Sequence, residues 1–333
     1  MNDTKTSGYI NKVIYDEIND HTLLKALTTV FNFYLPCAAL SLGFIGNTVI
    51  IIIMTKRLRK RQSVVMSYHF RALALGDNGA LIFGYGQRLM INNLPNIFDF
   101  INGDFLCKVL NYSVFVCLGF HVWNVIIISI DRFVAVCLPL KAAAWCTVKK
   151  ARACYLFNLG FHIVFNLVKL WKYYENDPAT IGVDVCINPS EFPPWFEGFI
   201  TSFFVIIVNY ASPIIVLILS VSILVKFKQQ GNELQNIGKS SFPQKNADQE
   251  RHLTVMIMVT AFVFIFCLSC FPLTDMCWKF LIPKAAEAYP LIRLLSIHVT
   301  YFFMILNPCL NFYIYLLVSA SFRNDFVRLF KHP

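Results

Sequence analysis

The sequence predicts an all-α membrane protein, a seven-transmembrane helix bundle followed by a short amphipathic C-terminal helix. Hydrophobic residues make up 57% of the 333 residues and charged residues only 14%, against about 25% charged in a soluble domain. Long uncharged stretches recur along the chain, and a helix needs about 20 apolar residues to cross a bilayer. Lysine and arginine gather in alternate connections between these stretches, as on the cytoplasmic side of membrane proteins.

The spans are predicted in order from these stretches. Five are uncharged and long enough to cross the membrane: 26–55, 109–130, 198–225, 252–274 and 294–322. Two more are less uniform, because 64–91 contains Arg71, Asp77 and Arg88, and 153–168 is short and partly polar. Counting both gives seven spans. A soluble bundle would instead show a polar face along every helix.

The basic residues set the predicted orientation. Clusters in the first, third and fifth connections and in the tail include Lys56, Arg57, Lys149, Lys150, Lys226, Lys228, Arg323 and Arg328. If the spans alternate, all of these lie on the cytoplasmic side of the plasma membrane. The chain then divides into an extracellular N-terminal segment (1–28), a seven-transmembrane domain (29–318) and a cytoplasmic amphipathic helix with the tail (319–333).

Charge and short motifs suggest further partners. The net charge of +10 predicts attraction to anionic membrane lipid and to acidic faces of a cytosolic protein, and we expect no nucleic acid partner. Asn2-Asp3-Thr4 is an outward-facing glycosylation sequon. Residues 319–330 place Phe322, Phe326, Leu329 and Phe330 on one helical face, which indicates a helix at the inner membrane interface.

The predicted topology sorts the eleven cysteines. Cys107, at the outer end of the third span, and Cys186, in the outer loop 173–197, are the pair most plainly in oxidising space. We expect them to form a disulfide, with a bridge between Cys37 and Cys277 as a further possibility. The remaining cysteines are expected to be small apolar packing residues. No cysteine shows metal-site spacing with histidine, so we expect no metal site of this kind.

An acid and a base stand together where the third span ends. Asp131 and Arg132 directly follow the uncharged stretch 109–130. Such a pair is tolerated only near the end of a membrane helix or facing the protein interior. From Cys107 to Arg132 a helix is about 38 Å long, more than the apolar slab of about 30 Å. The cysteine and the arginine are therefore expected on opposite sides of the bilayer.

Several short motifs, each on the matching span, together resemble the rhodopsin-like G-protein-coupled receptors over essentially the whole chain. They are Gly46-Asn47, Leu73-Ala74-Leu75-Gly76-Asp77, Asp131-Arg132-Phe133, Pro213, Phe266 with Pro272, and Asn307 through Tyr315. Phe312 stands where that family usually has a proline, a variant similar to invertebrate FMRFamide-like neuropeptide receptors. The resemblance implies a receptor that couples ligand binding outside to a heterotrimeric G protein inside.

The resemblance also assigns roles. Asp131 and Arg132 would pair at rest, and Arg132 would be released toward the G protein on activation. Phe266, Pro272, Asn311 and Tyr315 would complete the switch, although Cys270 replaces the family's tryptophan.

Asp77 would join Asn47, Asn307 and Asn311 in a buried polar network, where the family binds sodium. His121 stands where the family has a serine. It would be either a counter-charge that replaces sodium and makes the resting state pH-sensitive, or a neutral histidine held by hydrogen bonds.

The family's ligand cavity maps onto the outer half of the bundle. Val114 stands where amine receptors have an aspartate, so an amine ligand is not expected. The other candidate ligand-binding residues are Arg88, Phe115, Leu118, Asp184, Asp275, His298 and Tyr301. Val183-Asp184-Val185-Cys186-Ile187 alternates as a strand would, which favours a hairpin lid over a peptide. The acidic lid suggests a basic residue in that peptide.

Other functions fit less well. The runner-up is a lipid- or nucleotide-responsive receptor of the same fold, with Arg88 as partner of a phosphate or carboxylate. A secondary transporter would more often show internal repeats, which the two halves lack. We expect no enzyme, because no nucleophile and base constellation or glycine-rich phosphate loop is present.

Overall fold

The computed structural model describes residues 22–60, 64–86, 103–171, 173–174, 186–187, 206–236, 244–284 and 289–331, with positions 89, 199, 202 and 203. Within these residues the chain is almost entirely helical. The exception is one antiparallel pair of two-residue strands, β1 (Tyr173–Tyr174) and β2 (Cys186–Ile187). The predicted all-α fold class is therefore confirmed. Of the strand expected over 183–187, Cys186 and Ile187 form β2, and residues 183–185 lie outside the described residues.

Seven long helical segments form the bundle in the described residues. They are α2 (Thr22–Thr29), η1 (Val30–Tyr34) and α3 (Leu35–Arg59); α4 (Val64–Gly79) and η2 (Ala80–Gly86); α7 (Gly103–Cys137); α9 (Val148–Phe165) and η3 (Leu167–Trp171); η4 (Ile206–Ala211) and α11 (Ser212–Asn236); α12 (Gln244–Met276) and η5 (Cys277–Leu281); and α14 (Pro290–Val318). Two short helices, α8 (Pro139–Trp145) and α15 (Ala320–Lys331), follow α7 and α14.

Five described segments have the length and apolar composition needed to cross a bilayer. They are Leu23–Arg59, Lys108–Cys137, Ile206–Gln229, Leu253–Leu281 and Pro290–Val318. These match the five uniform spans expected from the sequence. Among the described residues, α2 already belongs to the first helical segment ahead of position 29. The domain start expected there stays a prediction.

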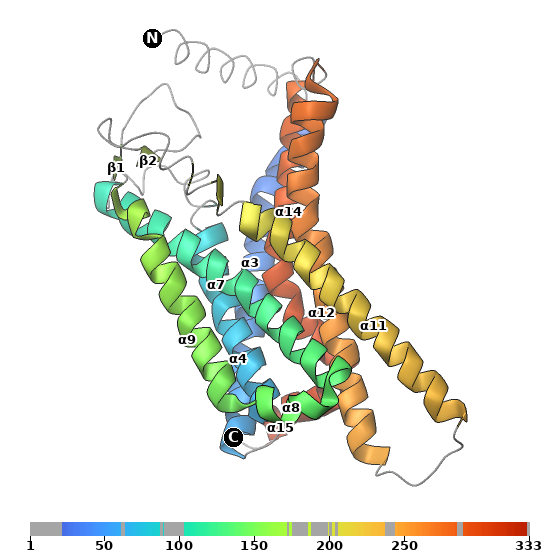
Figure 1. Ribbon diagram of the computed structural model, residues 1–333. Helices are drawn as coiled ribbons and strands as arrows, with labels where there is room; N and C mark the ends of the chain where they lie inside the picture. The colour runs from blue at the N-terminus through green and yellow to red at the C-terminus, as the bar shows by residue number, and fades with distance from the viewer. Residues whose placement is uncertain are drawn as a thin grey trace.

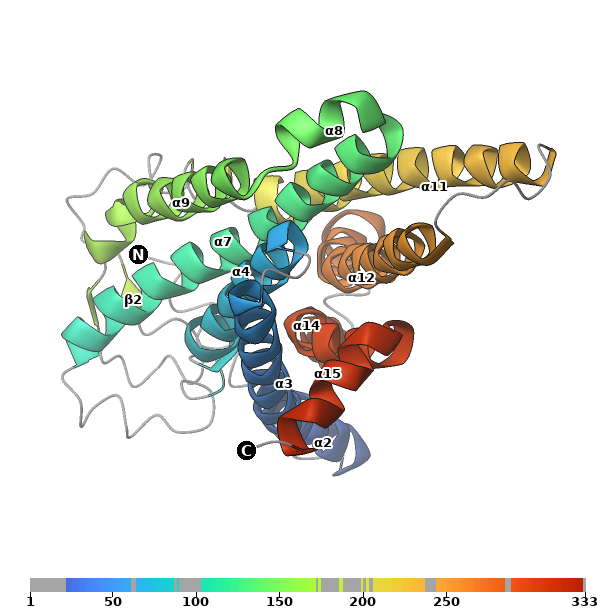
Figure 2. The same ribbon diagram turned by 90° about the horizontal axis from the view of Figure 1, so that it is seen from below.

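The helices lie roughly along one direction, with α8 and α15 together at one end (Figure 1). We call that end the inner end and the opposite end, where β1 and β2 lie, the outer end. Helix α7 contacts α4, α9 and α11, while α14 packs between α3 and α12. Viewed from below, α15 runs from α14 toward α3 (Figure 2). The bundle thus brings α3, α4, α7 and α14 together around one interior.

Local chemistry explains where several helices begin. Pro139 and Pro290 occupy the first turns of α8 and α14, where a missing N–H leaves no hydrogen bond unmade. The Thr147 side chain accepts a hydrogen bond from the Lys150 amide at 3.4 Å and caps α9. Extended Ser319 ends α14, and its hydroxyl accepts from the Phe322 amide at 3.2 Å. One serine therefore separates the seventh span from the predicted amphipathic helix.

An aromatic cluster fastens α15 to the bundle. Phe312 stands edge-on to Phe322 and Phe326, with ring centroids 6.0 and 5.6 Å apart. Buried Phe322 also contacts Tyr315, at 5.7 Å between centroids. On its other side Phe312 closes against Gly46, where an added Cβ would meet the Phe312 Cβ at 2.8 Å. The phenylalanine in the family's proline position thus links α3, α14 and α15.

The contact between α7 and α9 yields a stability prediction. A Cβ added at Gly119 would lie 2.3 Å from ring atoms of buried His162, whereas a Cβ at Gly160 of α9 would meet nothing within 4 Å. Gly119→Ala should therefore destabilise the fold by about 1–3 kcal/mol or more through overpacking. Gly160→Ala, the matched control, should be neutral or stabilising by roughly 0.5–1 kcal/mol. Thermal melting of the two purified variants checks this, and equal melting temperatures would contradict it.

Candidate functional site

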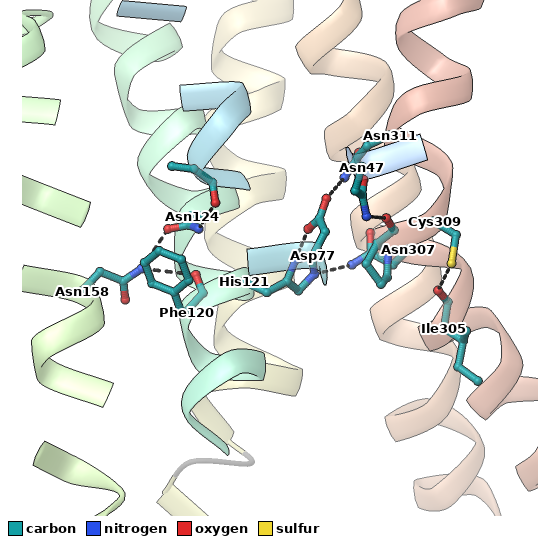
Figure 3. Close-up of polar contacts among 12 residues, drawn as sticks. Asn47, Asp77, Phe120, His121, Asn124, Asn158, Ile305, Asn307, Cys309 and Asn311 are labelled. Atoms are coloured by element: carbon teal, nitrogen blue, oxygen red, sulfur yellow. Dashed lines mark hydrogen bonds and ion pairs between the residues drawn. The ribbon is translucent and has the colours of Figure 1, made fainter. Parts of the chain in front are cut away.

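A buried polar network lies in the middle of the bundle (Figure 3). Asp77 of α4 is 0% exposed and His121 of α7 only 2%. The His121 Nδ1 lies 2.6 Å from Asp77 Oδ1, and the Asn311 amide donates to Asp77 Oδ2 at 2.7 Å. Both carboxylate oxygens therefore have a hydrogen-bonding partner from another helix, which is what a buried carboxylate requires.

The other two members of the expected network complete it. The Asn307 amide nitrogen lies 3.0 Å from His121 Nε2, and the Asn47 amide donates to the Pro308 carbonyl at 3.0 Å. With Asn307 donating to Nε2, the imidazole keeps its proton on Nδ1 and donates it to Asp77. The sequence-predicted residues Asn47, Asp77, His121 and Asn307 are thus brought close together, and α3, α4, α7 and α14 are tied to one another there.

A second polar contact joins α4, α7 and α9 beside this network. Asn158 donates to the Asn124 side-chain oxygen at 3.0 Å and to the Phe120 carbonyl at 3.2 Å. Asn124, which is fully buried, donates in turn to the Ala72 carbonyl at 3.1 Å. Figure 3 shows Asn124 and Asn158 facing each other. Neither asparagine was singled out from the sequence, which showed only that the span 153–168 is partly polar.

At the inner end, Asp131 has two cationic or potentially cationic neighbours. The Arg132 Nη2 lies 3.3 Å from Asp131 Oδ2, as expected for the resting pair, and Arg132 is 5% exposed. His69 of α4, which the sequence analysis missed, places Nε2 3.4 Å from Asp131 Oδ1 and is 1% exposed. Each oxygen of this carboxylate therefore faces a different side chain.

Two further groups hold this inner cluster, which we define as His69, Asp131, Arg132, Cys146 and Tyr155. The hydroxyl of buried Tyr155, on α9, forms a short hydrogen bond with His69 Nδ1. If the hydroxyl donates, His69 carries its proton on Nε2, facing Asp131. The Cys146 thiol donates to the Asp131 carbonyl at 3.6 Å. Burial, with the nearby Asp131, raises the pKa of this thiol to about 11, so it keeps its proton.

The remaining switch residues do not all face the interior. Tyr315 is buried against Phe70, with ring centroids 4.9 Å apart, and Pro272 is buried within α12. Phe266, however, is 57% exposed and stands edge-on to Phe303 at 5.4 Å. Phe264 is the fully buried phenylalanine of that turn. The expectation that Phe266 lies at the interior switch is corrected, because the rotation of α12 turns its ring away from the interior, to the side surface of the bundle.

The candidate ligand residues lie in the outer half of the bundle. Val114, Phe115, Leu118, His298 and Tyr301 are all partly buried. The Tyr301 ring meets the Tyr85 ring at 5.7 Å. Asp275 forms an i,i+4 ion pair with Lys279 at 2.8 Å, so it already has a counter-charge. Arg88, Asp184 and Asn2 lie outside the described residues.

One cation near this region was not anticipated from the sequence. Lys169 of η3 is 1% exposed, and its Nζ lies 4.5 Å from the centroid of the Phe115 ring. A buried ammonium over an aromatic face is a cation–π contact. It places a positive charge beside a predicted ligand residue. The only available signal in the sequence was a lone lysine at the end of the fourth span.

The expected disulfide falls partly outside the described structure. The backbone of Cys186 in β2 pairs with Tyr174 of β1, and β1 in turn lies beside α7 (Figure 1). The side chains of Cys107 and Cys186 lie outside the described residues, so their bond stays a prediction. Cys37 and Cys277 are both free thiols, which rules out the further bridge considered between them in this structure.

Comparison with known proteins supports a receptor architecture. Residues 46–315 match the sequence model of the seven-transmembrane receptors of the rhodopsin family. The FMRFamide receptor of Drosophila melanogaster is 25% identical over 306 residues, which cover 87% of this chain and 52% of that receptor. Galanin receptor 2a of Danio rerio is 24% identical over 86% of this chain and 74% of its own length. Human cholecystokinin receptor type A is 27% identical over 40% of this chain and 30% of its own length. The chain thus spans about half the length of the Drosophila relative.

Proposed function

Because this chain belongs to the rhodopsin family of seven-transmembrane receptors, we propose that it is a plasma-membrane neuropeptide receptor that activates a heterotrimeric G protein. Its relatives include receptors for FMRFamide, galanin and cholecystokinin, which supports a peptide ligand. The proposed orientation puts the N-terminus outside and α15 inside the cell. The observation that carries the coupling role is the pair of partly buried Asp131 with buried Arg132 at the inner end.

The proposed mechanism is a shift between two arrangements of the bundle. At rest, His69 and Arg132 hold the two oxygens of Asp131. In the active form, the inner part of α12 moves outward about buried Pro272, and Arg132 leaves Asp131 to meet the G protein. A peptide at the outer end acts by preferring the active form, and the shift cannot exceed its difference in affinity for the two forms.

Charge at the outer end bears on the class of peptide. Asp275 is already paired with Lys279, which weakens the expectation that it receives a basic residue of the ligand. Partly buried Phe115, His298 and Tyr301 offer aromatic contact, and Lys169 sits against Phe115. These surroundings suit a peptide with aromatic side chains. The contribution of Asp184 stays part of the proposal.

Screening identifies the ligand class. Cells expressing the chain would be exposed to a neuropeptide library, with cAMP and calcium recorded in parallel, and to matched libraries of lipids and nucleotides. The proposal expects saturable responses to one or more related peptides that untransfected cells do not show. Responses confined to lipids or nucleotides would replace the peptide assignment with the alternative receptor class.

The polar network leads to a prediction about sodium. In this chain His121 Nδ1 and the Asn311 amide already contact the two oxygens of Asp77. We propose that the imidazole, neutral when Asn307 donates to Nε2, takes the place of the family's cation. Replacing sodium with a large organic cation should leave basal signalling unchanged, whereas His121→Ser should make basal signalling sodium-dependent by several-fold. G-protein nucleotide exchange in membranes measures both, and a sodium-sensitive wild type would refute the proposal.

A further inference from the structure

A charged cavity separates the inner end of α3 from α15. Its volume is about 180 Å³. Among the residues that the structure describes, it is lined by Ile53, Lys56, Arg57 and Lys60 at the end of α3, and by Asp325, Arg328 and Leu329 of α15. Figure 2 shows α15 passing close to α3 at this end of the bundle. The cavity therefore lies where the first span leaves the membrane and the amphipathic helix meets it.

The charges in this cavity are unbalanced. Arg57, which is buried, donates from Nε to Asp325 Oδ2 at 2.6 Å and from Nη2 to the Ser321 hydroxyl at 2.9 Å. The other Asp325 oxygen is 3.9 Å from Arg328 Nη1. Four cations and one carboxylate among the described lining residues give a net charge of +3 (4 − 1). Arg57 is held by Asp325, so Lys56, Lys60 and Arg328 supply the excess positive charge.

An apolar stripe on the membrane-facing side of α3 leads to these lysines. Ile45 and Ile52 are 61% and 43% exposed, and with exposed Lys56 they recur at spacings of seven and four, so they share one helical face. From Ile45 to Lys56 the helix rises about 16 Å, which is about half of the apolar slab of roughly 30 Å. The stripe therefore has the length of one leaflet and ends at the cavity.

We propose that this cavity binds the headgroup of a polyanionic phospholipid, of the phosphorylated inositol lipid class, while an acyl chain lies along the stripe. A headgroup with several negative charges matches the net charge of +3 better than one with a single charge. By bridging Lys56 and Lys60 to Arg328, the lipid would fix α15 against α3. This proposal depends on the proposed function only through the orientation of the chain, which places the site in the cytoplasmic leaflet.

Binding of a defined lipid tests the proposal. The full chain in nanodiscs of phosphatidylcholine would be titrated with a fluorescent phosphatidylinositol bisphosphate. The triple variant Lys56→Gln, Lys60→Gln, Arg328→Gln should lose at least about tenfold in affinity for the lipid. It removes three positive charges, and each contributes about 1 kcal/mol to the attraction of anionic lipid. The matched control Lys141→Gln, Lys149→Gln, Arg152→Gln removes three exposed inner charges elsewhere and should stay within about twofold.

Separate arms identify the source of the headgroup. Soluble inositol trisphosphate and inorganic phosphate, which have no acyl chain, should compete much more weakly than the lipid. Phosphatidylserine should bind less tightly than the bisphosphate. Arg328→Gln alone provides a second variant, because that side chain is 72% exposed and its loss leaves the packing intact. It should weaken binding by a few-fold.

Three results would overturn the site. They are no preference of the wild-type chain for the bisphosphate over phosphatidylcholine, equal losses in the two triple variants, and equal binding of soluble inositol trisphosphate. The last would indicate a free phosphate site without a lipid. The assay measures binding and involves neither an agonist nor a G protein, so its failure leaves the proposed receptor function standing.

Discussion

Arg132→Ala is expected to abolish G-protein activation while leaving peptide binding within a few-fold of wild type. Arg132 is 5% exposed and provides the guanidinium that pairs with Asp131 at 3.3 Å. Without this guanidinium, the position carries no cation that could leave Asp131 and extend to the G protein. The candidate ligand residue Phe115 lies seventeen positions earlier on the same helix, about 26 Å away along its axis, so the outer end should be little disturbed.

The variant should also fold. Removing one partner of a buried ion pair usually costs stability because the other charge is left uncompensated. Here His69 Nε2 still faces Asp131 at 3.4 Å, so the carboxylate keeps one neighbour. Nucleotide exchange on purified G protein, agonist binding and surface abundance would be measured together. Arg152→Ala, an exposed arginine at the inner end of α9, serves as the control. Normal nucleotide exchange by Arg132→Ala would disprove the assigned role.

The sequence predicted correctly those features that depend only on the order of apolar, polar and charged residues along the chain. Uncharged length located the five uniform spans, since a charge inside a span is expensive. Spacing along the motifs found Asp77, His121, Asn307 and Asn311, because each sits on a span that the family places around one interior. The spacing of Phe322, Phe326 and Leu329 identified α15, because apolar residues four and three positions apart share one face of a helix whose other side is polar.

The sequence did not predict which side chains face the interior, because that depends on the rotation of each helix about its axis. In a bilayer both the lipid-facing and the protein-facing sides of a span are apolar, so periodicity does not tell them apart. Phe264 and Phe266 are alike in sequence, yet one is 0% and the other 57% exposed. The pairing of Asn124 with Asn158 and of Lys169 with Phe115 depends on how α7, α9 and η3 are placed in space. No spacing within one helix records such contacts.

The contact of His69 with Asp131 was hidden for the same reason. His69 lies at the inner end of α4 and Asp131 at the inner end of α7, and the two meet because those helices pack together. The sequence showed only a histidine eight positions before Asp77. Tyr155 comes from a third helix, and its hydroxyl orients the imidazole. Together they add a restraint on the ion pair that the motif Asp131-Arg132-Phe133 alone does not reveal.

Removing this restraint should activate the receptor. His69→Phe is expected to raise basal signalling by about tenfold, because Asp131 loses the imidazole nitrogen that lies 3.4 Å from its Oδ1, and a loss of about 1.4 kcal/mol is a factor of ten. The carboxylate of Asp131 then turns more freely, and Arg132 leaves it more often. Tyr155→Phe, which removes one hydroxyl, should have a smaller effect of the same sign.

Two comparisons distinguish this restraint from general packing. His69→Gln keeps an N–H donor near the position of Nε2 and should restore low basal signalling. In the Asp131→Asn background, His69→Phe should add little, because the charged acceptor is already gone. Basal nucleotide exchange normalised to surface abundance measures all four variants. If glutamine behaved as phenylalanine does, or if His69→Phe raised basal exchange by the same factor with and without Asp131, His69 would be acting through the shape of the α4–α7 contact and not through the carboxylate.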